Sequence, residues 1–203
     1  MTSLYLVRHG QTEHNRGGLA LGRADVPLNE TGVAQAEAVA RALAGEQIAA
    51  VYSSPLQRAL DTAAAIAAAH ELQLVTDDGL IEMDVGDLEG LEYPVLGQKH
   101  PEFLEKWLGP EGATTVMPGG ESLTAVRDRV WPTVSRLLKA HEGEAVVLVT
   151  HNFVILTLLS EYLGLGLANF RRLRHEVAAI SRVEWVRGRS VVALLNDTCH
   201  LRE

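Results

Sequence analysis

Two short apolar segments of this chain each end at a histidine. Residues 4–7 lead into Arg8-His9-Gly10, and residues 145–150 lead into His151. Apolar runs of this length predict buried strands, and α/β proteins bind their ligands at the carboxyl ends of such strands. We therefore expect His9 and His151 to contribute to one site. A histidine can act there as a nucleophile or as a proton carrier near neutral pH.

Arg8 and Arg58 are the cations expected to bind an anion beside these histidines. A guanidinium presents a planar fork of donors that matches phosphate or carboxylate. Arg58 follows a Ser-Ser-Pro sequence in which Ser54 suits a helix N-cap and Pro55 suits the first helical turn. A helix starting there would direct Arg58 back towards the strand ends. The competing interpretation, a solvated surface arginine, stays open on these residues alone.

An acidic segment offers a proton donor. Glu82 and Asp84 lie on either side of Met83, and glycines follow at Gly86 and Gly90. A carboxyl group held beside apolar side chains has its ionised form disfavoured, so it can donate a proton. Either Glu82 or Asp84 could serve in this way. Taken alone, however, the segment is better interpreted as an ordinary acidic loop.

The elements that must position these side chains alternate between strand and helix. We predict strands at 4–7, 48–52, 74–75 and 145–150, helices at 33–43, 54–69, 100–108, 123–141 and 154–163, and a terminal β-hairpin at 178–186 and 190–196. This order is typical of a three-layer α/β/α sandwich with a mostly parallel central sheet and a C-terminal antiparallel hairpin. The 203 residues predict a single domain, 1–203, with an excursion or lid at about 93–120.

Composition limits the classes of partner. The formal net charge of -8 at pH 7 argues against nucleic acid or an anionic membrane surface as the main partner. No apolar run approaches the ~18 to 20 residues that span a bilayer, and the first residues do not resemble a signal peptide. The single cysteine, Cys199, cannot form an intrachain disulfide, which permits a reducing compartment. We expect a cytoplasmic protein, and pairing through an edge strand would allow a homodimer.

Six motifs in this order resemble those of the histidine phosphatase superfamily, in its phosphoglycerate-mutase-like branch. They lie at 6–15, at 25–32, at 53–59, at Glu82 together with 86–90, at 118–122 and at 149–152. Each motif alone is modest evidence, but six in the family's order make a chance match improbable. The resemblance extends from Leu4 to Leu201, and it implies the three-layer fold described above.

The resemblance also implies roles for the candidate residues. His9 would be the nucleophile and would form a phosphohistidine, while Glu82 would protonate the leaving oxygen. Arg8, Arg58 and a protonated His151 would bind the transferring phosphoryl group, with no metal and no other cofactor. The residues implied to bind substrate at the rim of the pocket are Asn15, Arg23 and Asn152.

Two of these rim positions depart from the family's pattern. The family commonly has glycine after the second histidine, where this chain has Asn152, whose side chain would narrow the pocket or add a donor. Many phosphatases of the group have glutamine before the glycine of the first loop, whereas this chain has Leu21-Gly22-Arg23. A cationic Arg23 at the mouth would favour substrates that carry a second anionic group.

A phosphomonoesterase acting on a small phosphorylated metabolite is the function that we expect. Phosphoglycerate mutase is the less favoured alternative, because mutases of this family typically have a larger substrate-enclosing insertion than the one at 93–120. A catalytically inactive phosphate-binding module is a third hypothesis. The sequence does not identify the organic part of the substrate.

Two other classes of hydrolase fit less well. A cysteine-dependent phosphatase needs a cysteine followed five residues later by an arginine, and Cys199 is not placed in this way. A metal-dependent hydrolase could use His9, His151, Glu82 and Asp84. The neighbouring arginines would, however, repel a divalent cation.

Overall fold

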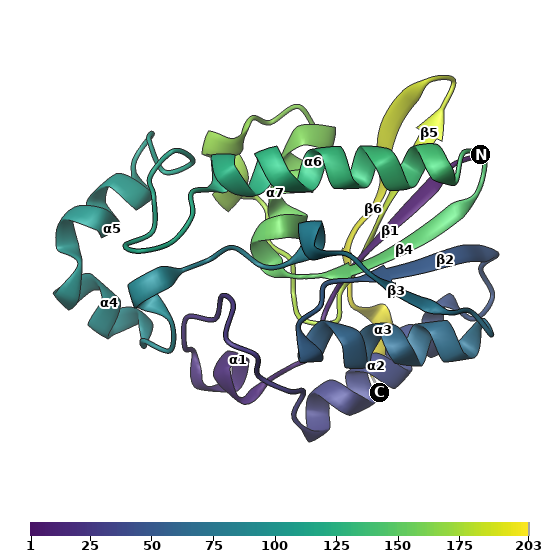
Figure 1. Ribbon diagram of the computed structural model, residues 1–203, viewed down its shortest axis with the longest axis horizontal. Helices are drawn as coiled ribbons and strands as arrows, with labels where there is room; N and C mark the ends of the chain where they lie inside the picture. Colours follow the sequence, from purple (N-terminus) through teal and green to yellow (C-terminus); the bar gives the residue numbers. More distant parts are fainter. Residues whose placement is uncertain (203) are drawn as a thin grey trace.

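The computed structural model describes residues 1–202, which form a central sheet of six strands flanked by helices (Figure 1). The strands are β1 (Ser3–Arg8), β2 (Ile48–Ser53), β3 (Leu74–Thr76), β4 (Ala145–Thr150), β5 (Ile180–Val186) and β6 (Arg189–Asp197). Their order across the sheet is β3-β2-β4-β1-β5-β6. The pairs β1/β4, β2/β4 and β2/β3 are parallel, whereas β1/β5 and β5/β6 are antiparallel. This confirms the predicted mostly parallel sheet with its C-terminal antiparallel hairpin.

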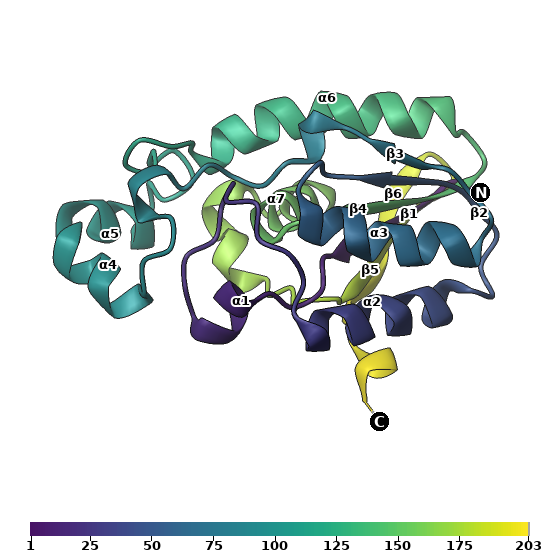
Figure 2. The same cartoon turned by 60° about the horizontal axis from the view of Figure 1, so that its bottom comes forward.

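Helices cover both faces of the sheet (Figure 2). One face packs against α2 (Glu30–Leu43) and α3 (Gln57–Ala69), and the other against α6 (Leu123–Ala140) and α7 (Asn152–Tyr162). The reason is the alternation of side chains along a strand: Leu4 and Leu6 of β1 join the cluster of α6 and α7, while Tyr5 and Val7 join that of α2 and α3. Both faces of β1 are therefore apolar, and the predicted three-layer sandwich is confirmed.

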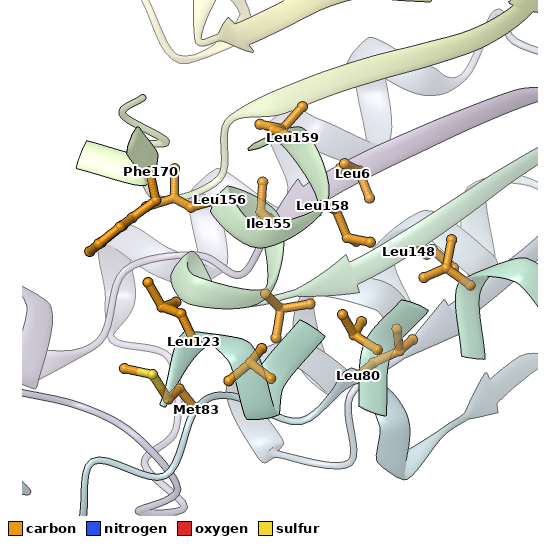
Figure 3. Close-up of a cluster of buried hydrophobic side chains, with 14 of the residues drawn as sticks. Leu6, Leu80, Met83, Leu123, Leu148, Ile155, Leu156, Leu158, Leu159 and Phe170 are labelled. Atoms are coloured by element: carbon orange, nitrogen blue, oxygen red, sulfur yellow. The ribbon is translucent and has the colours of Figure 1, made fainter. Parts of the chain in front are cut away.

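The core on the α6 and α7 face also holds the acidic segment in place. Figure 3 shows Leu6 and Leu148 of the sheet beside Leu158 of α7, with Leu80 and Met83 in the same cluster. Leu80 and Met83 are fully buried. Because they flank Glu82, their burial fixes the backbone that carries this carboxyl group.

The remaining helices are short. They are α1 (Glu13–Gly17), α4 (Tyr93–Lys99), α5 (Pro101–Leu108) and the short 3-10 helices η1 (Asp78–Leu80), η2 (Gly86–Leu88), η3 (Leu167–Arg172) and η4 (Cys199–Leu201). Figures 1 and 2 show α4 and α5 together beyond the carboxyl ends of the parallel strands. Within residues 1–202, no helix combines the length and the apolar character needed to cross a membrane.

The start of α3 differs from the prediction. The helix begins at Gln57, its N-cap is Leu56, and Ser54 lies before it in extended chain. The Ser54 hydroxyl accepts the Leu56 N–H at 3.3 Å and hydrogen bonds to a ring nitrogen of His151 at 2.7 Å. The prediction that Ser54 caps the helix was wrong, because the backbone is still extended at Leu56, with φ -71° and ψ 136°, and the Ser54 hydroxyl lies two residues before this N-cap.

Candidate active site

The carboxyl ends of β1 and β4 bring the two histidines together. The parallel register pairs Arg8 with Thr150, so His9 and His151 follow side by side. Their ring centroids are 5.1 Å apart, and both side chains are buried. The backbone N–H of His9 donates to the backbone carbonyl of Thr150 at 3.1 Å, and this bond continues the pairing of β1 and β4 into the site.

The hydrogen bonds of the His9 ring determine its tautomer. Nδ1 lies 2.7 Å from the Gly10 carbonyl oxygen, which can only accept, so Nδ1 carries the proton. Nε2 then has a free lone pair, and it accepts a hydrogen bond from Nε of Arg58 at 3.3 Å. Burial, reinforced by the charges of Arg58 and Arg8, lowers the pKa of His9 well below its ordinary value. The ring is therefore a neutral imidazole with a nucleophilic Nε2.

Arg58 is oriented by the backbone of the loop at 22–24, the loop that carries the predicted rim residue Arg23. Arg58 is the second residue of α3 and is fully buried. Its two terminal nitrogens donate to the carbonyl oxygens of Gly22 and Ala24, both at 2.7 Å. The loop is held in turn by Glu89, whose carboxylate accepts the N–H groups of residues 22, 23 and 24 at 2.8, 2.9 and 3.2 Å. A chain of hydrogen bonds thus runs from Glu89 to the loop, to Arg58 and to His9.

Arg8, the last residue of β1, is held by two neighbouring residues. Its NH1 donates to the His175 carbonyl at 2.6 Å and to the side-chain oxygen of Asn152 at 3.3 Å. Its Nε is buried and has no hydrogen-bond partner among the described residues. Asn152 therefore orients Arg8, which gives a physical role to a residue that stands where the family commonly has glycine.

His151 differs in charge from the expectation. Its Nε2 pairs with Ser54, and its Nδ1 is buried without a partner within residues 1–202. Burial, then Arg58 and the other neighbouring cations, lower the pKa of His151 well below its ordinary value. The expected imidazolium is therefore disfavoured by burial and by the two guanidinium groups close by, unless an anion binds beside them.

Glu82, rather than Asp84, faces the site. The two carboxyl oxygens of Glu82 accept the backbone N–H groups of Met83 at 2.8 Å and of Phe153 at 3.2 Å, and only 3% of the residue is exposed. Burial raises the pKa of Glu82 even though these N–H groups and the nearby arginines act in the opposite direction. Asp84 instead accepts the Gly86 N–H and pairs with Arg23. Only Glu82 of the two lines the cavity described next.

A cavity of about 150 Å³ lies between the strand ends and helices α4 and α5. The polar and charged lining groups near the strand ends are Arg8, His9, Asn15, Glu82 and Asn152. Most of the other lining residues are apolar, and they come from 19–21, 85–88, 96–117 and Phe153. Arg58 and His151 are not among the lining residues, but each contacts the His9 ring.

The structure does not bring Arg23 into the cavity. Its guanidinium pairs with Glu121 at 3.1 Å and with Asp84 at 3.5 Å, and its Nε donates to the Glu82 carbonyl at 3.4 Å. Asn15 does line the cavity, and its side-chain oxygen accepts the Thr12 N–H as part of a capping box. The predicted contacts of Arg23 and Asn15 with substrate stay predictions, and the geometry favours that of Asn15.

Three further residues support the site and were not identified from the sequence. They are Ser54 beside His151, Thr62, which accepts the Gly10 N–H at 3.0 Å, and Glu89 behind Arg58. Ser54 and Glu89 lie in motifs at 53–59 and 86–90, but no local pattern indicates their partners. Among residues 1–202, no three His, Cys, Asp or Glu side chains gather in a way that could hold a metal ion.

Comparison with known proteins places this geometry in a family. Residues 4–198 match the family model described as "Histidine phosphatase superfamily (branch 1)". The chain is 35% identical to "Phosphoserine phosphatase 1" of Hydrogenobacter thermophilus over 100% of this chain and 96% of that protein. It is also 35% identical to "Probable phosphoglycerate mutase GpmB" of Yersinia pestis, over 99% of this chain and 95% of that protein.

A longer relative and a solved structure agree with this placement. The chain is 41% identical to "Bifunctional protein Rv2228c" of Mycobacterium tuberculosis over 98% of this chain, but it spans only 55% of that protein's length. The structure of the mycobacterial glucosyl-3-phosphoglycerate phosphatase Rv2419c with VO3 has a TM-score of 0.88 and 33% identity, and the match covers 97% of this chain and 99% of that one. The relatives named as phosphatases support phosphatase activity, and the chain belongs to the histidine phosphatase superfamily.

Proposed function

We propose that this chain is a phosphomonoesterase that hydrolyses a small phosphorylated metabolite through a phosphohistidine at Nε2 of His9. The observation that carries the proposal is the state of this ring. Its proton is held on Nδ1 by the Gly10 carbonyl, and its pKa is lowered, so Nε2 has a lone pair available at neutral pH. That lone pair points at Nε–H of Arg58, a donor suited to a phosphoryl oxygen.

In the first step, Nε2 of His9 attacks phosphorus and the bond from phosphorus to the ester oxygen breaks. Glu82, whose pKa is raised by burial, gives its proton to the leaving oxygen. In the second step, water attacks the phosphohistidine while the Glu82 carboxylate accepts a proton from that water. The bond from phosphorus to nitrogen breaks, inorganic phosphate leaves, and both side chains return to their starting states.

The binding of the phosphoryl group relies on donors that are already in place. The Nε–H of Arg58 would pass from Nε2 of His9 to a phosphoryl oxygen, which frees the nucleophile. The buried nitrogens without partners among the described residues, Nε of Arg8 and Nδ1 of His151, would donate to the other oxygens. Burial and then the neighbouring cations lower the pKa of His151, and a bound dianion would act in the opposite direction and favour uptake of a proton by this ring. Charge stabilisation and positioning of this kind dominate phosphoryl transfer.

The test is phosphate release from a panel of phosphomonoesters, combined with trapping of the phosphoenzyme. We expect an acid-labile, base-stable phosphoenzyme in the wild type that is lost in His9→Ala, together with a fall in kcat/KM of at least about 1,000-fold. We also expect turnover to survive a strong chelator. Undiminished hydrolysis by a correctly folded His9→Ala variant would overturn the proposal, as would binding of vanadate without turnover of any ester.

Phosphoglycerate mutase is the second candidate, because relatives that match almost the whole chain carry the name "Probable phosphoglycerate mutase GpmB". A mutase must return the phosphoryl group of the phosphohistidine to a sugar acid before water attacks it. The two activities separate when phosphate release is compared with isomerisation of 3-phosphoglycerate in the presence of the bisphosphate primer. Isomerisation faster than phosphate release would favour the mutase.

A further inference from the structure

We infer that this site selects phosphate monoesters whose organic group is apolar and about the size of one ring, and that it discriminates against esters that carry a carboxylate. The inference rests on the proposed phosphomonoesterase function and specifies its substrate class. It is drawn from the wall of the cavity opposite the strand ends and from the charges around that wall.

The wall is a continuous apolar and aromatic surface. Phe103 stacks on Trp107 with ring centroids 5.9 Å apart, and Trp107 meets Phe153 edge to face at 6.0 Å. All three line the cavity, and so do Leu21 and Leu104. An apolar group placed against these side chains loses its contact with water. This burial favours binding in proportion to the apolar area removed from water.

This wall begins next to the reacting groups. Phe153 directly follows Asn152, which holds Arg8, and the Phe153 N–H donates to Glu82 at 3.2 Å. A leaving group protonated by Glu82 therefore extends along the ring of Phe153 towards α5. The cavity of about 150 Å³ must also hold the phosphoryl group at its Arg8 and His9 end, so the space along the wall limits the organic group to about one ring.

A second anionic group on the substrate would find no cation on this wall. Arg8 is the one cation lining the cavity within residues 1–202, and it lies at the phosphoryl end. Arg23, the rim cation, is paired with Asp84 and Glu121 outside the cavity. Arg171 lies over the rings of Trp107 and Phe170 and donates to the Trp107 carbonyl, so it is also engaged elsewhere.

The polar groups that remain near the wall are neutral. Asn15 and Tyr93 line the cavity, and neither carries a positive charge. A carboxylate on the organic group would lose its hydration beside apolar side chains and would lie near Glu82. Leaving such a charge unpaired in an apolar site is costly, so esters of this kind should bind and react poorly.

The test compares esters that release the same kind of leaving group. 2-Phenylethyl phosphate, n-propyl phosphate and O-phosphoserine all yield a primary alcohol, so differences in kcat/KM report on the organic group. We expect 2-phenylethyl phosphate to exceed n-propyl phosphate by at least about 10-fold and O-phosphoserine by at least about 100-fold. Equal or higher kcat/KM for O-phosphoserine would overturn the inference while leaving the phosphomonoesterase function intact.

A charge placed on the wall should reverse this preference. Leu104 is half-buried on the cavity side of α5, whereas Leu108 of the same helix is 62% exposed and does not line the cavity. We expect Leu104→Lys to lower the ratio of kcat/KM between 2-phenylethyl phosphate and O-phosphoserine at least about 10-fold. The matched control Leu108→Lys should leave the ratio unchanged. An unchanged ratio in a folded Leu104→Lys variant would contradict the inference.

Binding of phosphonates tests the preference for an apolar organic group separately from turnover. 3-Phenylpropylphosphonate and 2-amino-4-phosphonobutyrate have the shapes of the two extreme esters but cannot be hydrolysed. Calorimetry should show tighter binding of the phenyl compound to the wild type, and tighter binding of the amino acid would refute the inference. If no ester were hydrolysed, the proposed function would fail, yet this measurement would still report which organic group the cavity accepts.

Discussion

Replacing Glu82 by glutamine tests the proton donor with little change in shape. The two carboxyl oxygens of Glu82 accept N–H groups from Met83 and Phe153. Glutamine keeps one acceptor and directs an NH2 group at the other backbone N–H. One buried donor is then unsatisfied, at a cost to the free energy of unfolding of about 1 to 3 kcal/mol. We expect the variant to fold, with a lower denaturation midpoint than the wild type.

The catalytic effect should depend on the leaving group. An alkoxide leaves poorly without a proton, so kcat/KM for 2-phenylethyl phosphate should fall by about 100- to 10,000-fold in Glu82→Gln. That loss corresponds to about 2.7 to 5.4 kcal/mol of transition-state stabilisation. A nitrophenolate departs without a proton, so kcat/KM for 4-nitrophenyl phosphate should fall by less than about 10-fold.

The assay must separate the two chemical steps, because the Glu82 carboxylate also accepts a proton from water in the second one. The value of kcat/KM reports only events up to formation of the phosphohistidine, which makes it the right quantity to compare. With 4-nitrophenyl phosphate, the variant should show a burst of nitrophenolate equal to the enzyme concentration, followed by slow turnover. The phosphoenzyme should accumulate during that slow phase.

The pH dependence of activity is an independent test of the role of Glu82. Because burial raises the pKa of Glu82, the wild type should keep its activity on 2-phenylethyl phosphate above the ordinary range of a carboxyl group and lose it as pH rises through the raised pKa. This alkaline limb should be absent with 4-nitrophenyl phosphate. An equal loss of kcat/KM on both esters in Glu82→Gln, with no difference in their pH profiles, would refute the assignment of Glu82 as the acid.

Three further predictions concern the residues that support the site. Glu89→Gln should lower kcat/KM about 10- to 100-fold on alkyl and aryl esters alike, because Glu89 positions the loop that holds Arg58 and does not act on the leaving group. Gly32→Ala should lower the free energy of unfolding by at least about 1 to 3 kcal/mol in urea titrations, because a Cβ there would lie 2.1 Å from the Gln11 carbonyl oxygen. Burial, then Arg8, lower the pKa of His175 to about 3, so between its ordinary value and about 3 the unfolded chain binds a proton that the folded chain does not. His175 should therefore make stability fall by about 1.4 kcal/mol per unit as pH drops through this interval, and His175→Gln should reduce the slope by that amount.

Each of these predictions has a result that would contradict it. A Glu89→Gln variant that slows only alkyl esters would indicate a direct role in protonation of the leaving group. Gly45→Ala is the control for Gly32→Ala, since nothing lies within 4 Å of a Cβ at Gly45, and equal stability changes in the two variants would refute the steric argument. An unaltered acid slope in His175→Gln would show that other groups dominate the unfolding at low pH.

Local sequence patterns were sufficient to predict the architecture and to predict that the two histidines lie together. Each parallel strand is a short apolar run, and in β1 both faces are buried, so the run stands out without any knowledge of its neighbours. The chain also shows where β1 and β4 stop, at Arg8 and Thr150. Parallel strands align their carboxyl ends, and this is enough to predict that His9 and His151 meet.

The start of α3 differs from its local prediction, and the contacts of Ser54 are not local. Ser54 has the composition and spacing of an N-cap, and its hydroxyl does accept a backbone N–H, that of Leu56. The helix nevertheless begins at Gln57, after the extended backbone of Leu56, and the same hydroxyl also binds His151, which is 97 residues away. A local capping preference of about 1 kcal/mol is readily overridden by such a buried contact.

The sequence by itself determined the alternating fold, the two histidines at the strand ends and, through its six motifs, the family. Only the tertiary structure decided the chemistry of each group. Glu82 and Asp84 are two residues apart and have similar neighbours in the sequence. The burial of Leu80 and Met83 places Glu82 at the cavity, whereas Asp84 pairs with Arg23. The tautomer of His9, the pairing of Arg23 and the apolar wall likewise depend on contacts between distant segments, which no local pattern encodes.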